Sequence, residues 1–362
     1  RPEEDFRVHG SFKTAWPFRT SSSFKDGTNK TVVLSIPDIR IFELFSDFQL
    51  GDSVYFRFGK ATVKWGVGYF FSPADIINLE PIDFFDPTAQ REGPLQFRVF
   101  IPYGPSQNTL SFYAIFDEDN PDFKTTALAG KAEFVLGNYE LGASAYYRND
   151  TTERAALTVS GPIGIFDMFA EGVLARGSPK TFYTFSSTAP YIALSQAADH
   201  RTTLYPSATA GFLYNDQNNN LTTIAQYFYN GEGYSNADRK NNITTLTNLL
   251  TMLPAGTTKD TVLGAGKLAA LFSGRHYGAA SVSLSEIGGS DFSASILGIM
   301  NLSDTSGFVY PTVSWQIADY LKLSLFSLIF YGADDTEYGI LAPYGPRPIS
   351  IGLKLTAGTG NF

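Results

Sequence analysis

The chain has 362 residues, of which 43% are hydrophobic and 15% aromatic but only 17% charged, and its mean hydropathy is -0.07. Soluble domains usually carry about 25% charged residues. This balance is therefore unusual for a soluble enzyme and typical of strands that alternate between lipid and an aqueous lumen. The net charge of -8 argues against a nucleic-acid partner, and the absence of cysteine excludes a disulfide framework and thiolate metal sites.

No apolar stretch reaches about 18 residues, so the sequence predicts no transmembrane helix. The chain begins with "RPEEDF", which does not match a signal peptide. If the protein is exported, we expect its signal to have been removed or to be absent from this chain.

Apolar and polar residues alternate with a period of two along most of the chain, which predicts β-strands. Most of these strands have about 10 residues or more, enough to cross a bilayer when tilted. In chain order, the sixteen predicted strands lie at residues 6–17, 31–50, 53–66, 94–103, 107–117, 125–137, 138–149, 152–162, 165–177, 203–215, 219–230, 270–287, 290–302, 307–318, 320–332 and 346–357.

Seven connections between these strands are short and mostly contain Gly, Asn, Asp or Pro, the residues that tight turns require. Their sequences are "LGDS", "YGPSQN", "LGNY", "GPIG", "NDQNNN", "GGS" and "ADY". The connections that alternate with them include every long one, at residues 18–30, 67–93, 178–202, 231–269 and 333–345. Short turns at one end and long loops at the other are the layout of an outer-membrane barrel.

We therefore predict an all-β fold, in which residues 1–362 form a single domain. This domain is a closed antiparallel transmembrane β-barrel of about sixteen strands, because an open sheet would leave exposed edges. We expect the short turns and both termini in the periplasm and the long loops outside the cell. The terminal Phe362 resembles the aromatic C-terminus by which bacterial outer-membrane barrels are recognised for assembly, although a short "GTGNF" tail follows the last alternating residues. The alternative is a soluble sheet with one solvated face.

Charged residues recur on one face of the predicted strands. A charge on the lipid face costs about 2–4 kcal/mol at the bilayer midplane, so we expect these side chains to line a wet lumen. After Gly59 the alternation changes phase, which predicts a bulge at Gly59-Lys60. Other charged residues expected on the inward face are Glu43, Asp47, Arg57, Arg98, Lys131, Glu133, Glu140, Arg154, Asp167, Glu171, Arg275, Lys322 and Lys354.

The segment 58–99 is the most distinctive part of the sequence. It resembles a segment of alginate-export-like and related uncharacterised outer-membrane barrels, through a "WG" pair, a "P-x-D-x-x-N" loop and an Arg-Glu-Gly return. The matching positions are Trp65, Gly66, Pro73, Asp75, Asn78, Asp83, Arg91, Glu92 and Gly93. The resemblance covers about forty residues and implies the barrel class; the rest of the chain does not resemble an alginate exporter.

The loop 67–93 is too apolar to be solvated, and it carries the acids Asp75, Glu80, Asp83 and Asp86. We expect it to fold into the lumen with these acids near the bases Arg57, Lys60, Lys64 and Arg98, and to narrow the pore as the inward loop of porins does. The alternative is a packed surface loop with no gating role. The predicted pore-lining and constriction residues are Glu43, Asp47, Arg57, Lys60, Lys64, Asp75, Glu80, Asp83, Asp86, Arg91 and Arg98.

The long extracellular loop 231–269 contains a short helical pattern that ends at Pro254. A helix there would cap the pore mouth or pack on its rim; the alternative is loop packing alone. The apolar residues that carry the pattern are Ile243, Leu246, Leu249, Leu250 and Leu253.

No enzyme signature is present. The chain has only three histidines and neither a G-x-S-x-G nor an H-E-x-x-H motif, so we expect no catalytic activity, no cofactor and no metal. We predict an outer-membrane channel for passive diffusion of small hydrophilic solutes or ions, in contact with outer-membrane lipid and lipopolysaccharide or an equivalent. The alternative is a loop-plugged barrel that acts as a substrate-specific exporter or importer, or as a structural protein. The solute and a homo-oligomeric state are left open.

Overall fold

Sixteen antiparallel strands form one continuous sheet in the computed structural model, in the order β1-β4-β5-β6-β7-β8-β9-β10-β11-β14-β15-β16-β17-β18-β19-β20. Their bounds are Phe6–Thr14 (β1), Ile39–Leu50 (β4), Val54–Lys60 (β5), Leu95–Tyr103 (β6), Asn108–Ile115 (β7), Ala127–Leu136 (β8), Tyr139–Tyr147 (β9), Glu153–Ile163 (β10), Phe166–Arg176 (β11), Leu204–Asp216 (β14), Leu221–Tyr229 (β15), His276–Leu284 (β16), Phe292–Asn301 (β17), Ser306–Ala318 (β18), Leu321–Tyr331 (β19) and Ile349–Ala357 (β20). The structure describes residues 6–14, 20–25, 31–36, 39–51, 53–77, 92–104, 107–118, 122–149, 152–178, 183–186, 193–196, 202–241, 244, 248, 274–333, 336–339 and 349–357.

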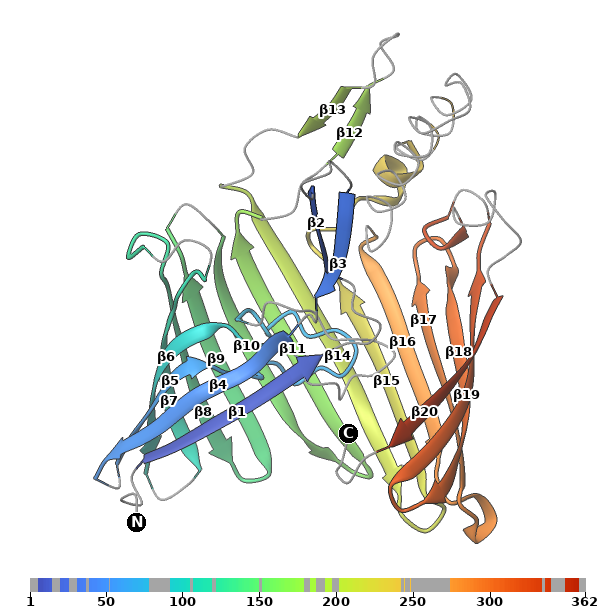
Figure 1. Cartoon of the computed structure of the whole chain (residues 1–362), viewed down its shortest axis with the longest axis horizontal. Helices are drawn as coiled ribbons and strands as arrows, with labels where there is room; N and C mark the ends of the chain where they lie inside the picture. The colour runs from blue at the N-terminus through green and yellow to red at the C-terminus, as the bar shows by residue number, and fades with distance from the viewer. Residues whose placement is uncertain are drawn as a thin grey trace.

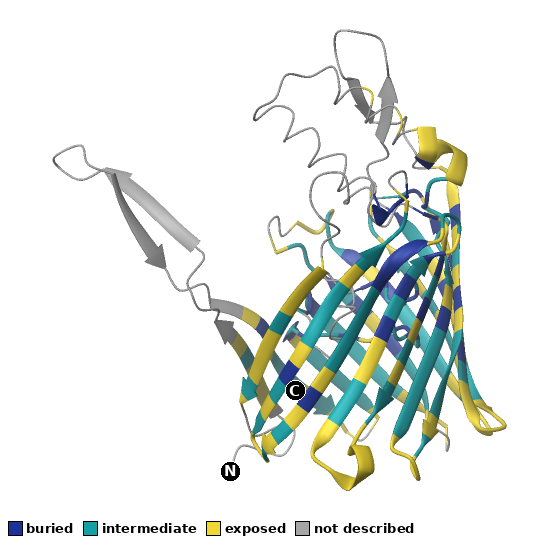
Figure 2. Cartoon of the chain, turned by 90° about the vertical axis from the view of Figure 1, so that its right-hand side faces the viewer, coloured by how far each residue is buried: buried dark blue, intermediate teal, exposed yellow. Residues whose placement is uncertain are grey.

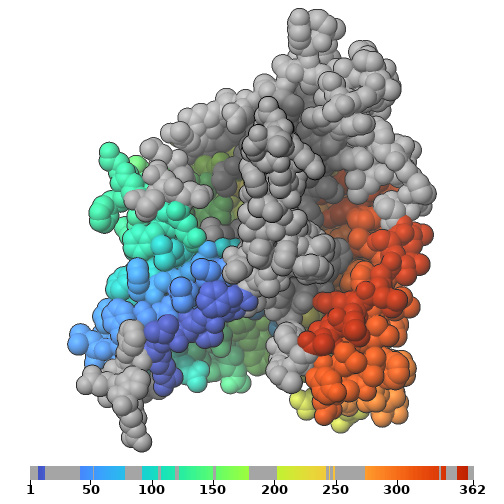
Figure 3. Space-filling model, viewed as in Figure 1, coloured from blue at the N-terminus to red at the C-terminus, as the bar shows by residue number. Residues whose placement is uncertain are grey.

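The sheet curls round, so that β1 and β20 approach each other from opposite sides (Figure 1). In the space-filling view the first strands, in blue, and the last strands, in red, flank the same face (Figure 3). The predicted all-β fold of sixteen antiparallel strands is confirmed. Within the described residues the recorded pairings run from β1 to β20 without joining these two strands, so closure of the barrel stays a prediction.

The connections follow the predicted alternation. Short turns join β4 to β5, β6 to β7, β8 to β9, β10 to β11, β14 to β15, β16 to β17 and β18 to β19. The register opposes Phe6 to Phe48 and Ala357 to Leu321, so β1 begins and β20 ends at the short-turn end of the sheet. The turn between β16 and β17 contains a single 3-10 turn, η1 (Ile287–Gly289).

Three features differ from the sequence prediction. β2 (Thr20–Lys25), which pairs with β3 (Thr31–Ile36), and the hairpin of β12 (Tyr183–Ser186) with β13 (Ala193–Gln196) stand in the connections 18–30 and 178–202, which we expected to be loops. β3 and β4 are separate strands, whereas the sequence predicted one strand over 31–50. The predicted bulge at Gly59-Lys60 is wrong: the register of β5 with β4 and β6 shows no shift, and the strand ends at Lys60. The alternation changes phase there because the chain leaves the sheet.

The outer face of the sheet is apolar. Large hydrophobic side chains stand exposed at every second position, and exposure alternates along the strands in Figure 2. A monomeric soluble protein seldom exposes a contiguous apolar patch of more than a few hundred Å², so this face requires an apolar environment. Its exposed residues include Leu44, Phe58, Phe112, Leu128, Phe134, Leu157, Val159, Leu174, Val282, Ile296, Val313, Leu325, Leu353 and Leu355.

Aromatic residues mark the ends of this apolar band. Next to the short turns, exposed rings occur at Tyr103, Tyr139, Phe166, Phe292, Trp315 and Tyr320. At the opposite ends of their strands, Tyr147 and Tyr227 are also exposed. Aromatic girdles at both water interfaces are typical of strands that cross a membrane.

In the described part of the loop between β15 and β16, residues 236–241, 244 and 248 are helical. The helix begins after Ser235, whose hydroxyl accepts a hydrogen bond from the N–H of Asp238 (3.1 Å). The predicted apolar helix residues between Ile243 and Leu253 lie outside the described residues. In the part of the chain that the structure describes, no helix is long and apolar enough to cross a membrane.

Candidate functional site

Residues 61–77 leave the end of β5 and run inside the curled sheet (Figure 1). We call these residues the inner segment. The start of the segment is tied to the wall: the N–H of Thr62 donates to Glu43 Oε1 on β4 (3.0 Å), and Gln96 on β6 donates to the carbonyl of Ala61 (2.7 Å). The inner segment therefore starts at the base of the β5–β6 hairpin.

Glu171 of β11 is the first anchor of the inner segment. Its Oε1 accepts hydrogen bonds from the N–H groups of Val67 (2.6 Å) and Gly68 (2.7 Å) and from the hydroxyl of Ser72 (3.0 Å). Its Oε2 accepts the N–H of Ala74 (2.8 Å). The side chain of Glu171 is 3% exposed. Hydrogen bonds to a charged group contribute about 1.5–3 kcal/mol each, so this carboxylate holds the segment strongly.

Gln226 of β15 is the second anchor. Its Oε1 accepts the N–H of Phe70 (2.8 Å), with longer contacts to the neighbouring N–H groups, and its Nε2 donates to the carbonyl of Phe71 (2.5 Å) and to Thr209 Oγ1 (2.6 Å). Thr209 of β14 lies opposite Glu171 in the register. The two anchors therefore lie on the inner faces of β11 and β15, and Thr209 of β14 lies between them.

Apolar contacts extend the inner segment to both sides of these anchors. On one side Trp65 packs edge-on against Tyr113 of β7, with ring centroids 5.2 Å apart, and Lys131 of β8 donates to the carbonyl of Trp65 (2.9 Å). On the other side Phe71 stacks on Phe228 of β15 at 4.9 Å. Phe70 and Phe71 share a buried cluster with Tyr277, Ala279, Leu297, Ile299, Phe308 and Tyr338. This part of the lumen is therefore packed with apolar side chains.

Charged side chains line the inner face of β4 to β6, where these apolar clusters do not reach. Arg57 makes a bidentate pair with Asp47 (2.7 and 2.9 Å) and lies over the ring of Phe45 at 3.8 Å. Arg98 lies over the ring of Phe100 at 4.8 Å. A cavity of about 380 Å³ opens beside Asp47, Arg57 and Arg98. Guanidinium groups held by aromatic rings and a carboxylate present a polar, ordered wall.

A second cavity, of about 630 Å³, lies between the inner segment and the short turns. Its lining includes Lys64 and Tyr69 from the segment and Glu140, Ser160 and Asp167 from β9, β10 and β11. Both signs of charge therefore face the space on the short-turn side of the segment.

Of the seven predicted site residues that the structure describes, Asp47, Arg57, Arg98 and Lys64 line these two cavities, whereas Glu43, Lys60 and Asp75 do not. Glu43 accepts the N–H of Thr62 at the start of the inner segment (3.0 Å). Lys60 lies opposite Leu44 and Leu95 in the register and pairs with Glu92 and with Glu118 (3.0 Å), which places it at the loop-side rim rather than in the lumen. Asp75 accepts the N–H of Trp65 (3.3 Å), so it orders the segment itself. Glu80, Asp83, Asp86 and Arg91 lie outside the described residues.

The sequence analysis missed the roles of Glu171, Gln226 and Thr209. The sequence predicts Glu171 on the inner face, but only as one of several charged residues in contact with water. The available signal was a charged or amide side chain in the middle of a strand with apolar neighbours, such as "MFAEGVLA" and "TTIAQYFY". A buried polar group at such a position needs a partner, yet the pattern does not say which loop supplies it.

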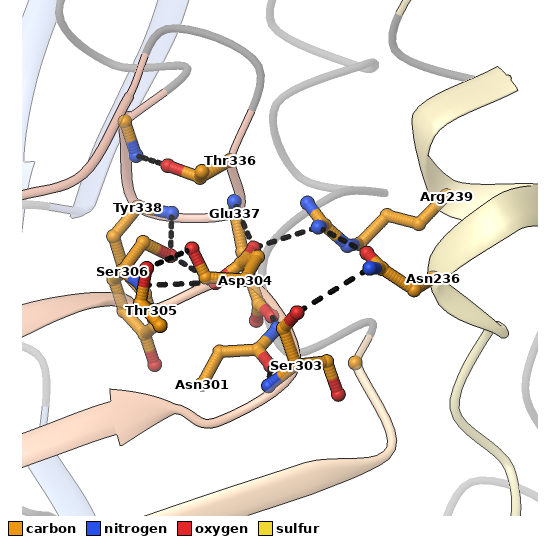
Figure 4. Close-up of polar contacts among 12 residues, drawn as sticks. Asn236, Arg239, Asn301, Ser303, Asp304, Thr305, Ser306, Thr336, Glu337 and Tyr338 are labelled. Atoms are coloured by element: carbon orange, nitrogen blue, oxygen red, sulfur yellow. Dashed lines mark hydrogen bonds and ion pairs between the residues drawn. The ribbon is translucent and has the colours of Figure 1, made fainter.

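A second buried polar cluster joins three connections at the loop side of the sheet (Figure 4). Arg239 of the 236–241 helix pairs with Asp304 (2.8 Å), and the two side chains are 2% and 1% exposed. Asp304 also accepts the N–H of Glu337 (2.8 Å). The Glu337 carboxylate accepts hydrogen bonds from Tyr277 (2.9 Å) and Asn301 (2.6 Å). This mouth network, made of these five residues, holds the helix and the β19–β20 connection to the wall.

Replacing Arg239 with Met should release the helix at 236–241 from the wall. Removing one partner of a buried ion pair costs about 3–5 kcal/mol, because the other charge is left buried. The amides of residues 236–241 and 336–339 should lose hydrogen-exchange protection. The matched control is Arg176→Met, which breaks an exposed pair with Glu153 (3.4 Å, 56% and 43% exposed) and should change protection by about 0–1 kcal/mol. Equal effects of the two substitutions would contradict the proposed role of the mouth network in holding the helix to the wall.

Docking of the β19–β20 connection should weaken as the pH rises. Burial, and to a smaller degree the charge of Asp304, raises the pKa of the Glu337 carboxyl above its ordinary 4.5, against the hydrogen bonds from Tyr277 and Asn301. Between the ordinary and the raised pKa the docked state binds more protons than the undocked one, so its stability falls with increasing pH. Protection factors of residues 336–339 should follow this slope, and Glu337→Gln should abolish it. A slope that persists in the variant would assign the effect to another group.

No family model matches the chain, and no curated protein matches it. Among solved structures it is similar to OccK11 (OpdR) of Pseudomonas aeruginosa, at 9% identity and a TM-score of 0.48 over 90% of this chain and 82% of that one. It is also similar to OccK10 (OpdN) of that organism, at 8% identity and a TM-score of 0.46 over 99% and 96%. A third similar structure is the outer membrane protein opdK of Pseudomonas aeruginosa, at 9% identity and a TM-score of 0.45 over 82% and 76%. Such distant similarity transfers neither residues nor a substrate to this chain.

Proposed function

We propose that the protein is an outer-membrane channel through which small hydrophilic solutes or ions diffuse passively. The observation that carries this proposal is the contrast between the two faces of the curled sheet. The outer face is apolar and bordered by aromatic rings, as lipid requires, while the inner face carries Asp47, Arg57, Arg98, Glu140 and Asp167. Charged residues on the inside of a membrane-spanning sheet need water, and water on the inside makes a path.

In this proposal the short turns and both termini face the periplasm and the long loops face outwards. The inner segment acts as the constriction, since it occupies the side of the lumen next to β7 to β18. The remaining passage runs along Asp47, Arg57 and Arg98, and Lys64 of the segment faces the second cavity. Outer-membrane lipid contacts the apolar band. No group of three or more potential metal ligands occurs among the described residues, and none of these side chains forms a catalytic set.

A second candidate function is a loop-plugged barrel that opens only for a specific substrate or serves as a structural protein. The apolar packing of Phe70 and Phe71 favours it, because these rings are buried among the side chains of the wall. Planar-bilayer recording of the purified protein separates the two. Stable single-channel steps in potassium chloride support the open channel, whereas silence under the same conditions, with the barrel correctly assembled, supports the plug.

A further inference from the structure

The part of the inner segment around Glu171 has the form of an anion cradle. Three backbone N–H groups and one hydroxyl converge on the two carboxylate oxygens at 2.6–3.0 Å. Successive N–H groups that point into one concavity are a general device for binding an anion. Among the ion pairs of the described residues none involves Glu171, so its negative charge is balanced by these donors rather than by a base.

The chain of the cradle has no room for side chains at two positions. A Cβ atom at Gly66 would lie 1.6 Å from Ser72 Oγ and 2.6 Å from Glu171 Oε1. A Cβ atom at Gly68 would lie 2.0 Å from the carbonyl oxygen of Phe71. Glycine is the residue that permits such an approach of backbone to ligand. Gly66 therefore fits the segment to the carboxylate, and Gly68 fits it to the turn held by Gln226.

The chemistry of the cradle selects a carboxylate over its neutral isostere. An amide oxygen at the Oε1 position would satisfy Val67, Gly68 and Ser72, but its NH₂ group would then face the N–H of Ala74, a donor against a donor. Gln226, by contrast, meets both a carbonyl and N–H groups and is correctly an amide. The two anchors are therefore not interchangeable.

We propose that residues 66–74 form a carboxylate receptor whose built-in ligand is Glu171, and that this contact positions the inner segment in the lumen. Glu171 is thus a positioning residue of the constriction. When its side chain is shortened, a small free carboxylate takes its place and restores the segment. This proposal rests on the proposed channel function only in the conductance measurement; the labelling experiments do not require a conducting protein.

The chain has no cysteine, so one introduced thiol reports on the segment alone. Ile76, which is 8% exposed and part of a buried cluster with Val63, Trp65 and Tyr113, is the reporter position. In Ile76→Cys protein a charged methanethiosulfonate reagent should react slowly. Adding Glu171→Ala or Glu171→Gln should accelerate labelling about tenfold or more, because the segment opens more often. Glu140→Gln, an inward carboxylate of β9 that lines the cavity below the segment, is the matched control and should leave the rate unchanged.

Chemical rescue distinguishes a receptor from a merely structural contact. Glutamate shortened to alanine lacks an acetate-sized fragment, so acetate should slow labelling of the Glu171→Ala protein towards the wild-type rate. Acetamide, of the same size but neutral, should not. Acetate should have no effect on Glu171→Gln, in which the amide still occupies the cradle. If Glu171→Ala does not assemble, Ser72→Ala removes one donor and should give an intermediate rate.

The experiments test the positioning role of Glu171, the carboxylate receptor and the channel function separately. Labelling of both Glu171 variants at the wild-type rate would overturn the positioning role. Rapid labelling that acetate and acetamide slow equally, or not at all, would overturn the receptor. In bilayers the Glu171→Ala channel should conduct more than the wild type and lose this excess in acetate. A wild-type protein that does not conduct would contradict the channel function and leave the labelling result standing.

Discussion

Excising residues 63–91 and joining Thr62 to Glu92 through two glycines should raise the single-channel conductance severalfold. The ends of this stretch already meet: the N–H of Ala61 donates to the carbonyl of Pro94 (3.3 Å), and Gly93 lies against the backbone of Ala61. The excision therefore leaves the pairing of β5 with β6 intact. It removes the inner segment from its contacts with β7 to β18 and replaces packed side chains with water.

Assembly of the shortened protein has to be verified before its conductance is interpreted. An intact barrel migrates faster on a gel when unheated than when boiled, and the excised protein should keep this difference. The expected current–voltage relation remains linear, with larger steps and a broader range of permeant sizes. Unchanged conductance from an assembled barrel would mean that the inner segment lies outside the conduction path, and the proposed constriction would be wrong.

A lysine at position 157 should destabilise the protein in lipid by about 2–4 kcal/mol, the cost of a charge on the lipid face of a membrane strand near the bilayer midplane. Leu157 lies in the middle of β10, is 67% exposed and stands opposite Ala143 and Gly172 on the neighbouring strands. Its side chain has no water to reach. The measurement is urea-induced unfolding of the Leu157→Lys variant from phospholipid vesicles.

Ser160→Lys on the same strand is the matched control. Ser160 faces the lumen, lines the 630 Å³ cavity and lies opposite Glu140 in the register. A lysine there stays in water and gains an opposite charge, so the unfolding free energy should change by about 1 kcal/mol or less. If both lysines destabilised the protein equally, the outer face would not be in lipid, and the assignment of the two faces would fail.

The strands could be predicted from the sequence because each of them obeys a local rule. In β20, Ile349, Ile351, Leu353 and Leu355 alternate with small or polar residues, and each is exposed on the outer face. A period of two needs no knowledge of distant residues, so thirteen of the sixteen strands of the sheet were located within three positions at each end. The predicted strands 31–50, 53–66 and 270–287 differ from β4, β5 and β16 by six to eight residues at one end. The hairpins β2–β3 and β12–β13 do not belong to the main sheet, so the alternation between its outer and inner faces does not apply to them.

The site could be predicted only in part. The apolar character of residues 69–77 indicates a segment that avoids solvent, but the residues that hold it come from strands far along the chain. In the described part of the loop, the wall supplies an acid, Glu171, and the loop supplies backbone N–H groups, a contact that the expected pairing of loop acids with wall bases did not include. Backbone donors leave no trace in a sequence. Gly66 and Gly68 are visible in the sequence as a "WGVG" stretch, but their contact with a carboxylate depends on how the fold places β11 beside them.

The distance along the chain between the inner segment and its anchors sets an order for folding. Glu171 is 103 residues from Gly68, and Gln226 is 156 residues from Phe70. The β5–β6 hairpin needs neither, since its own hydrogen bonds close it. The inner segment lacks both anchors until β11 and β15 have joined the sheet, and only its contacts with β4, β6, β7 and β8 can form earlier. Contacts between such distant residues form late. A growing sheet therefore carries the apolar inner segment without its anchors through most of assembly, and the segment must dock before the last strands pair. This makes the inner segment the part of the newly made chain most exposed to aggregation.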